Sequence, residues 1–284
     1  MRRLAEYAMK APRNAAILAV LLGCLPVLSW LSASVVALVS LRKGAGAGVV
    51  VALWAILPAL YLGYLGDSIA LPLLLLVFVS AMVLRASVSL VYAVLVQQFG
   101  AAVVTLLFVK MELPAYQQLL SLFQQVFEKM ELAKQFDIPA LSTQQLALIT
   151  ANFYSFSLAS TAVLALLVAR YWQSLLYIPE GFKQELYRFR LPSSVSTVLV
   201  LLLVTAQSSE LLSSVMLLLT VPLMLAGGAL VHGLVNIAGG SRRSLVLFYM
   251  ATFVLGPYLY LPLIIVVLAD SFLDFRSRLK NSSQ

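Results

Sequence analysis

Charged side chains are scarce in this sequence: Asp, Glu, Lys and Arg make up 11% of the 284 residues, whereas apolar residues make up 62%. A water-soluble domain usually carries about a quarter charged residues. So few charges cannot cover a protein surface in water, and lipid must therefore cover much of it. The composition predicts a membrane protein.

Histidine and cysteine are almost missing, with one residue of each, His232 and Cys24. A single cysteine excludes an internal disulfide, and a single histidine excludes a histidine cluster for a metal ion. The sequence also lacks a G-x-x-x-x-G-K-[ST] loop and a G-x-S-x-G motif, so nothing indicates ATP hydrolysis or serine-hydrolase chemistry. We expect no enzymatic activity, no catalytic residues, no metal site and no cofactor.

Positive charge exceeds negative charge, with 19 Lys and Arg against 11 Asp and Glu. A basic balance can indicate a nucleic-acid partner, but here the cations are spread over short loops between apolar runs. In a membrane protein that arrangement sets the orientation in the bilayer. We therefore expect the lipid bilayer, and not nucleic acid, to be the main partner.

Long apolar runs dominate the sequence. A helix needs about 17–25 apolar residues to span a bilayer, and every backbone polar group must be bonded within the protein. The runs predict a single integral membrane domain over 1–284, an all-α polytopic transmembrane bundle of about eight to ten helical segments. They are 15–41, 49–65, 69–84, 87–109, 146–168, 195–206, 211–237 and 245–269.

Three runs contain helix-breaking residues: 15–41, 211–237 and 245–269 are interrupted by Pro26, by Pro222 and by Gly256-Pro257. Sequence alone leaves open whether each is a single span or a hairpin.

The distribution of Lys and Arg favours one answer, because these residues concentrate on the cytoplasmic side. If the first and last of the three runs fold back as hairpins, only Lys110, Lys129 and Lys134 of the 19 cations lie outside. The other sixteen then face the cytoplasm. We therefore predict interrupted helices in a bacterial inner membrane, with both termini cytoplasmic.

The segment 110–142 is not a span. Apolar residues from Tyr116 to Met130 recur at helical spacing opposite a face of Gln side chains, which predicts an external amphipathic helix. Its neutral polar face favours capping of the bundle over binding of charged lipid. Ser142 and Gln145 predict a capping box at the start of the next helix.

The segment 170–192 is predicted to be a cytoplasmic interfacial loop. Aromatic side chains alternate there with charged ones, a pattern typical of membrane–water interfaces. One interpretation is an interfacial anchor with ordinary cytoplasmic positive charge, and the other is a docking surface for a cytoplasmic partner. The candidate docking residues are Arg170, Trp172, Tyr177, Phe182, Glu185, Arg188 and Arg190.

This segment also resembles a known family. Ala169-Arg170-Tyr171-Trp172-Gln173, then Tyr177, Pro179, Gly181-Phe182, Glu185 and Arg190-Leu191-Pro192, with Pro26, Trp30 and Leu41-Arg42-Lys43-Gly44 earlier, are similar to the YybS-like family of uncharacterised bacterial membrane proteins. The resemblance covers most of the chain. It implies an architecture distantly like the substrate-binding membrane subunits of energy-coupling-factor vitamin transporters, and hence a small-molecule carrier that depends on partner subunits. The resemblance identifies neither a substrate nor a site residue in this chain.

Polar side chains at membrane depth are candidates for a site, because lipid penalises them. The candidate ligand-binding residues are Gln97 and Gln98, in the middle of one predicted span, and Asn152 and Tyr154, in the outer half of another. The alternative for each is an interhelical hydrogen bond that fastens the bundle.

A second polar pair, His232 and Asn236, shares one helix face near the inner end of its predicted span. Here too an interhelical hydrogen bond is the alternative to a functional role. The neighbouring small residues Ala229 and Gly233 favour close helix packing at this place.

Two functions follow from these observations. The first is a small-solute-binding transport subunit without its own ATPase, and the second is a membrane scaffold or regulator that recruits a cytoplasmic partner through 170–192. A polar cavity at Gln97, Gln98 or Asn152 would favour the first function, and tight packing there would favour the second. Since no acidic residue lies in the middle of a predicted span, a carboxylate relay of an autonomous secondary transporter is not expected.

Overall fold

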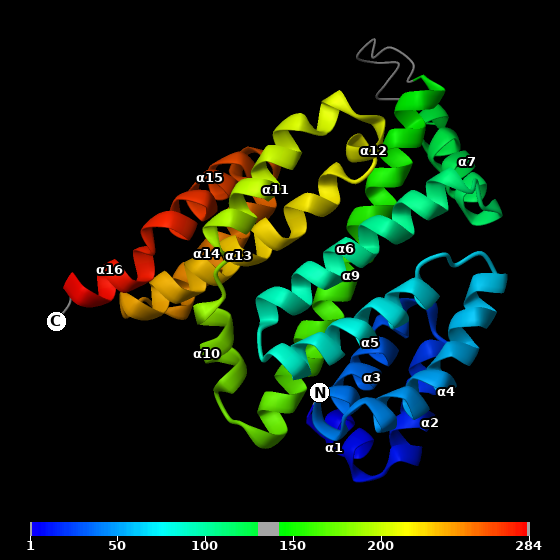
Figure 1. The fold of residues 1–284 in the computed structure, drawn as a ribbon, viewed down its shortest axis with the longest axis horizontal. Coiled ribbons are helices and arrows are strands. Elements are labelled where there is room, and N and C mark those ends of the chain that lie inside the picture. The colour runs from blue at the N-terminus through cyan, green and yellow to red at the C-terminus, as the bar shows by residue number, and fades with distance from the viewer. Residues whose placement is uncertain (1, 130–141, 283–284) are drawn as a thin grey trace.

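The computed structural model describes residues 2–129 and 142–282. Helices and short 3₁₀ turns account for the regular structure of these residues, and no strand occurs among them. The prediction of an all-α helical bundle is therefore confirmed (Figure 1). The α-helices are α1 (Arg2–Lys10), α2 (Pro12–Gly23), α3 (Ser29–Lys43), α4 (Ala45–Tyr64), α5 (Ala70–Ser87), α6 (Leu90–Lys110), α7 (Pro114–Lys129), α9 (Thr143–Tyr177), α10 (Gly181–Arg188), α11 (Ser193–Thr205), α12 (Glu210–Ser213), α13 (Met216–Ile237), α14 (Arg242–Leu255), α15 (Pro257–Leu273) and α16 (Phe275–Ser282), and the 3₁₀ turns are η1 (Pro26–Leu28) and η2 (Ala206–Ser208).

Five helices, α4, α5, α6, α9 and α13, are long and apolar enough to cross a membrane. A sixth candidate is the pair Gly181–Arg188 and Ser193–Ser208, bent by 63°, if it is taken as one broken span. The chain is therefore a multi-pass membrane protein. The run 211–237 contains one long helix, α13, which continues through Pro222.

The run 15–41 is broken and folds back on itself, as predicted. α2 ends at Gly23, η1 follows, and α3 packs against α2, where the Ser32 hydroxyl donates a hydrogen bond to the carbonyl oxygen of Ala19 (2.7 Å). At 1.5 Å per residue, α2 and α3 are about 18 and about 22 Å long, shorter than a hydrocarbon layer of about 30 Å. Such helices need neighbours that shield their ends.

The run 245–269 is also broken, at the predicted position. Gly256 has φ +34° and ψ −107°, which ends α14, and Pro257 begins α15. A residue with a Cβ would be strained at this φ, whereas glycine adopts it readily. The turn therefore joins two short helices, α14 and α15.

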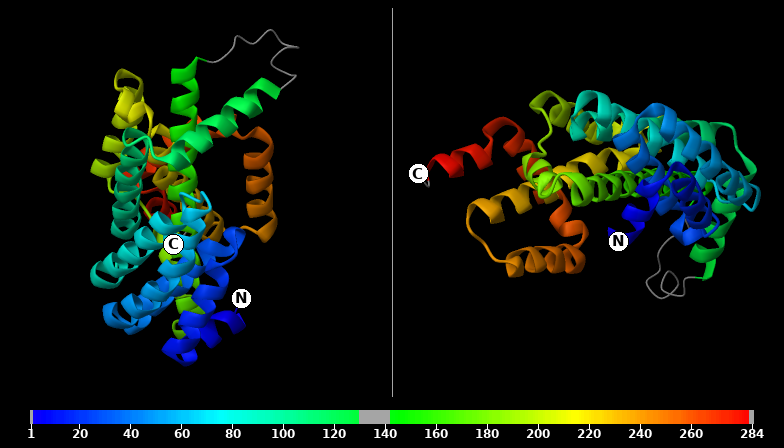
Figure 2. Two further views of the ribbon diagram at one scale, coloured as in Figure 1. Left: turned by 90° about the vertical axis from the view of Figure 1, so that its right-hand side faces the viewer. Right: turned by 90° about the horizontal axis from the view of Figure 1, so that it is seen from below.

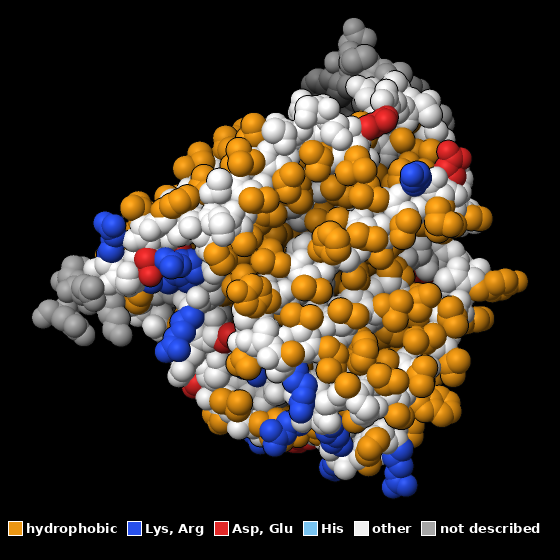
Figure 3. Space-filling model, viewed as in Figure 1, with side chains coloured by type: hydrophobic (Ala, Val, Ile, Leu, Met, Phe, Trp, Pro, Cys, Tyr) orange, Lys and Arg blue, Asp and Glu red, His pale blue; other side chains and the backbone are white. Residues whose placement is uncertain are grey.

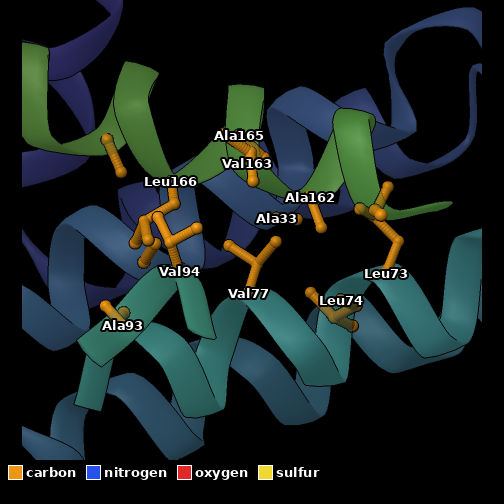
Figure 4. Packing of buried hydrophobic residues seen from close by; sticks show 14 of the residues in the cluster. Ala33, Leu73, Leu74, Val77, Ala93, Val94, Ala162, Val163, Ala165 and Leu166 are labelled. Carbon is orange, nitrogen blue, oxygen red and sulfur yellow. The ribbon is translucent and has the colours of Figure 1, made fainter. Parts of the chain in front are cut away.

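The core of the N-terminal helices forms around α3, whose residues Leu31–Leu41 are all buried. They are buried on every side because α2, α4, α5 and α9 pack around this helix. Figure 4 shows the apolar side chains that meet there, including Ala33 of α3, Val77 of α5, Val94 of α6 and Ala162 of α9. The long helix α9 also contacts α13 and α10 and so joins the N-terminal helices to the C-terminal ones (Figure 1).

Cations gather at one end of the molecule, which we call the cation-rich end. Blue side chains follow the left and lower margins of Figure 3. Contacts between helices bring them together: the Arg85 Nη1 donates to the carbonyl oxygen of Leu41 (2.6 Å), and the Arg42 guanidinium lies 4.2 Å above the Tyr177 ring. Of the three cations assigned to the other side by the sequence analysis, Lys110 lies at the opposite end of the molecule, and Lys134 lies outside the described residues. The side of the membrane that each end faces stays a prediction.

The segment 170–192 differs from the predicted loop. α9 continues to Tyr177, 178–180 form a turn, α10 follows as a separate helix, and 189–192 before α11 are extended or irregular. The prediction overlooked that apolar residues on one face continue past Ala169 to Trp172, with no helix breaker before Pro179. Helical periodicity therefore outweighed the interfacial composition.

The predicted amphipathic helix corresponds to α7, at the end opposite the cation-rich one. Tyr116 is buried, its ring edge-on to Phe108 at 5.5 Å between centroids, and α7 packs on α9. The predicted capping box is confirmed: Ser142 Oγ accepts from Gln145 N (3.2 Å), and Gln145 Oε1 accepts from Ser142 N (2.8 Å). The rest of the predicted external segment, 130–141, lies outside the described residues.

Candidate functional site

Gln97 and Gln98 are enclosed by packed helices. Gln97 is 0% exposed and Gln98 5% exposed. The amide nitrogen of Gln97 donates to the Ser80 hydroxyl (3.3 Å), while the Gln97 Oε1 and both amide atoms of Gln98 have no partner among the described residues. Neither residue lines either of the two cavities described below or the apolar cavity between α13, α14 and α15. Both side chains are instead enclosed by neighbouring protein atoms.

Asn152 fastens α9 to the start of α13. Its side-chain nitrogen donates to the carbonyl oxygens of Leu148 (2.9 Å) and Ser213 (2.6 Å), and its side-chain oxygen accepts from the backbone N–H of Leu217 (3.0 Å). These bonds occupy both amide hydrogens and one lone pair of the oxygen. The interhelical role, the alternative left open by the sequence, accounts for this residue.

Tyr154 fastens α9 to the N-terminal helices. Its hydroxyl donates to the carbonyl oxygen of Ser68 (3.0 Å), and its ring stacks on Phe108 at 4.2 Å. The side chain is 1% exposed. The four candidate ligand-binding residues are thus not brought together around a cavity.

Several of the predicted docking residues face inward. Trp172 is 0% exposed, so it is not available to a partner. Arg170 forms an ion pair with Glu185 (2.6 Å) and bonds to Gln173 (2.6 Å), which holds α10 against α9. Phe182 is half-buried in edge contact with Tyr171. Of the seven residues, only Tyr177 and Arg188 are exposed.

A cavity lies at the cation-rich end, between α10, α13 and α16. Its volume is about 700 Å³, within the range of small-molecule sites. We call it the polar cavity, because its walls include Tyr187, Arg188, Arg190, Asn236, Asp274 and Arg276. A smaller cavity of about 390 Å³ at the opposite end carries one cation and one anion, Lys110 and Glu210.

Arg276 forms the fixed wall of the polar cavity. Its Nη1 donates to the carbonyl oxygens of Tyr187 (2.8 Å) and Phe189 (2.9 Å), and its Nη2 pairs with Asp270 Oδ2 (2.7 Å). The Asp270 Oδ1 accepts from the backbone N–H of Phe275 (3.0 Å). The side chains of Arg276 and Asp270 are 11% and 3% exposed. Their charges therefore compensate each other in a buried place, as a buried ion pair requires.

The other two arginines are more accessible. Arg190 pairs with Asp274 at 3.1 Å, and both side chains are more than a third exposed. Arg188 is exposed and has no hydrogen bond or ion pair within residues 2–129 and 142–282. The cavity thus presents one uncompensated guanidinium beside two paired ones.

Gly233 lets the walls of the polar cavity approach each other. A Cβ on this residue would lie 3.0 Å from Arg276 Cδ and 3.2 Å from the carbonyl oxygen of Tyr187. The predicted close packing at this small-residue face is therefore confirmed. His232 lies one turn before Asn236, and the centroid of its ring is 6.3 Å from that of the Tyr187 ring. Its Nε2 forms a hydrogen bond with the Tyr249 hydroxyl (2.8 Å).

Sequence reasoning missed this cavity because its walls are far apart along the chain. They come from 184–190, 233–237 and 274–277. In the sequence, Arg276 is one of sixteen cations expected on the cytoplasmic side, and nothing marks it as part of a cavity. The one available signal was the polar face of α13, since Asn236 lies on the cavity wall and His232 beside it.

Comparisons with models of protein families, with curated proteins and with solved structures found no match. The resemblance to the YybS-like family is not tested by them and stays a prediction.

Proposed function

We propose that the chain is a membrane-embedded binding subunit for a small anionic solute, acting in transport with energy supplied by partner proteins. The polar cavity is the observation that carries this proposal. It has a volume of about 700 Å³ and combines three arginines with Tyr187 and Asn236 on its walls. Guanidinium groups bind phosphate and carboxylate through paired, charge-assisted hydrogen bonds.

Arg188 is the residue we expect to bind the anion. Arg276 is already bonded to Asp270 and to two carbonyl oxygens, so it positions the wall and has little capacity left. Arg188 has none of these commitments and lies on the same cavity. An incoming anion would compensate its charge.

We also propose that the cation-rich end faces the cytoplasm of a bacterial cell, as the positive-inside rule favours. The anion would then be bound or released on the cytoplasmic side. A topology reporter fused after Lys43 should read cytoplasmic, and one fused after Glu112 should read external. The reverse result would place the polar cavity on the outer side.

The binding proposal can be tested on purified protein in lipid nanodiscs. We expect phosphate monoesters or short carboxylates to raise the melting temperature, and Arg188→Ala to weaken their binding at least tenfold. Lys183→Ala is the matched control, because Lys183 is an exposed cation on α10 that does not line the cavity. Equal losses in both variants, or no response to any anion, would contradict the proposal.

The transport part needs a separate experiment. Affinity capture from native membranes, followed by mass spectrometry, should recover an ATPase and a second membrane subunit. Recovery of the chain without an ATPase would leave a binding protein and remove the transport role.

A membrane scaffold or regulator is the second candidate function, and the exposed part of the α9–α10 corner favours it. Tyr177, Ile178, Lys183 and Arg188 are exposed there. Crosslinking from Tyr177 that captures a cytoplasmic protein would support this function, and capture of lipid alone would count against it.

A further inference from the structure

A third cavity, of about 380 Å³, lies between α13, α14 and α15. We call it the apolar cavity, because its walls are hydrocarbon apart from two polar side chains, Thr252 and Tyr260. Thr252 is occupied by a hydrogen bond to the carbonyl oxygen of Phe248 (2.8 Å). Other wall residues are Met224, Val231, Ala251, Leu263 and Val266.

Water is a poor occupant of this cavity. A buried water needs two to four polar partners, and apolar cavities stay dry. The Tyr260 hydroxyl is itself buried, without a partner among the described residues, and so offers no accessible polar group to a water in the cavity. A hydrocarbon chain suits such a lining, and at membrane depth it is the chemistry at hand.

α14 covers the apolar cavity and is lightly held. Its main contacts are with α13 and α15, and in Figure 2 (left) the orange helix stands away from the bundle. The one side-chain hydrogen bond from α14 to another helix, within the described residues, joins Tyr249 to His232 (2.8 Å). Gly239 and Gly256, at the two ends of the α14 segment, have positive φ angles. A helix so attached leaves a route from the bilayer into the cavity.

The two cavities follow one another along α13. Val231 lies on the wall of the apolar cavity, and Asn236 on the wall of the polar cavity, about 7.5 Å further along the helix. His232 lies between them in sequence and contacts Tyr187 of one cavity wall and Tyr249 of α14. The order is that of a lipid in a bilayer: charged groups at the membrane surface and hydrocarbon at depth.

We infer that the anionic solute is an amphiphile, with its charged head in the polar cavity and one hydrocarbon chain in the apolar cavity. This inference rests on the proposed function, because the polar cavity must first bind an anion. The chain enters from the bilayer past α14, and the His232–Tyr249 pair marks the boundary between head and tail.

Methyl phosphate and decyl phosphate are suitable probes, since they share a head and differ in the tail. Binding to protein in nanodiscs is measured against empty nanodiscs, which removes partitioning into lipid. With about four methylenes buried, decyl phosphate should bind on the order of a hundredfold more tightly than methyl phosphate.

Ala251→Trp fills the apolar cavity, and Val266→Phe fills it from the opposite wall. Val254→Trp is the matched control, because Val254 is 72% exposed on the same helix and does not line the cavity.

The inference is supported if both filling variants lose the hundredfold preference for decyl phosphate over methyl phosphate. Both variants should still bind methyl phosphate as the wild type does, which shows that they are folded. Val254→Trp should behave like the wild type. Equal binding of the two probes, or equal losses in Ala251→Trp and Val254→Trp, would overturn the tail site while methyl phosphate binding preserves the proposed function. If neither probe binds the wild type, the proposed function fails as well.

Discussion

The helices before residue 110 and those after residue 181 are held together by different means. In the first region α3 is buried on all sides from Leu31 to Leu41, whereas in the second region no described side chain of α14 is buried. The first region packs small and branched apolar residues around a central helix. The second combines a well-packed helix, α13, with polar contacts at the cation-rich end and a lightly held helix, α14, and encloses the polar and apolar cavities.

This difference suggests a division of labour between the two regions. Hydrocarbon side chains gain little by leaving lipid for a protein interior, so helices associate in membranes through close packing and hydrogen bonds. A region that is already close-packed has no room for a solute. Beside α14, where the packing is sparse, the second region retains space in which one can bind.

The largest expected effect concerns the ion pair that holds the C-terminal region. Asp270→Ala should lower the free energy of unfolding by about 3–5 kcal/mol, because it leaves the Arg276 charge buried without its partner. Unfolding by dodecyl sulfate in mixed micelles measures this value. Glu6→Ala is the control, since its pair with Arg2 is exposed and should contribute less than about 1 kcal/mol. Similar losses in the two variants would mean that the pair does not hold this region.

The next effect concerns the core of the N-terminal region. Leu38→Ala should lower the free energy of unfolding by about 2–3 kcal/mol, because Leu38 is 0% exposed and its packing partners would border a void. Leu247→Ala on α14 should change it by less than about 0.5 kcal/mol, since Leu247 is 69% exposed. The same unfolding assay compares them. A larger loss at Leu247 would reverse the comparison between the regions.

A smaller effect concerns the close approach at Gly233. Gly233→Ala should destabilise the protein by about 1–2 kcal/mol, because the added methyl group meets Arg276 and the Tyr187 backbone. Gly228→Ala on the same helix, where no atom lies within 4 Å of the added group, should be neutral or stabilising by up to about 1 kcal/mol. If Gly233→Ala leaves the free energy of unfolding unchanged, the helices around the polar cavity can move apart to accept the methyl group, and the close approach is not needed for stability. Binding of methyl phosphate to both variants checks the cavity itself.

The smallest expected effect is a difference in stability between variants of two polar residues at membrane depth, Asn152 and Gln98. Asn152→Leu should cost about 1 kcal/mol, because it removes two hydrogen bonds from α9 to the backbone of Ser213 and Leu217 and one within α9. Gln98→Leu should be neutral or slightly stabilising, since the Gln98 amide has no partner among the described residues. If Gln98→Leu loses solute binding without losing stability, Gln98 belongs to the binding site. That result would contradict the proposal that the solute binds in the polar cavity.

The sequence by itself determined the class of the protein and its breaks. The apolar runs required helices in lipid, Pro26 and Gly256-Pro257 marked where two runs fold back, and Ser142 with Gln145 marked a helix start. Each of these is a local property, set by hydrophobicity, backbone freedom or capping within a few residues. The loop predicted for 170–192 was wrong because interfacial composition and helical periodicity overlap there, and burial of Trp172 depends on helices that are distant in sequence.

Only the tertiary structure decided which polar residues share a cavity. Gln97, Gln98, Asn152 and Tyr154 carried the same local signal, polarity at membrane depth, yet helices enclose the first two and Tyr154, and Asn152 bonds to the backbone of a neighbouring segment. Arg188, Asn236 and Arg276 carried weaker signals and meet because α10, α13 and α16 converge at the cation-rich end. A polar side chain in a span must face protein, but whether that protein is a packed helix or the wall of a cavity depends on long-range contacts that no short stretch of sequence contains.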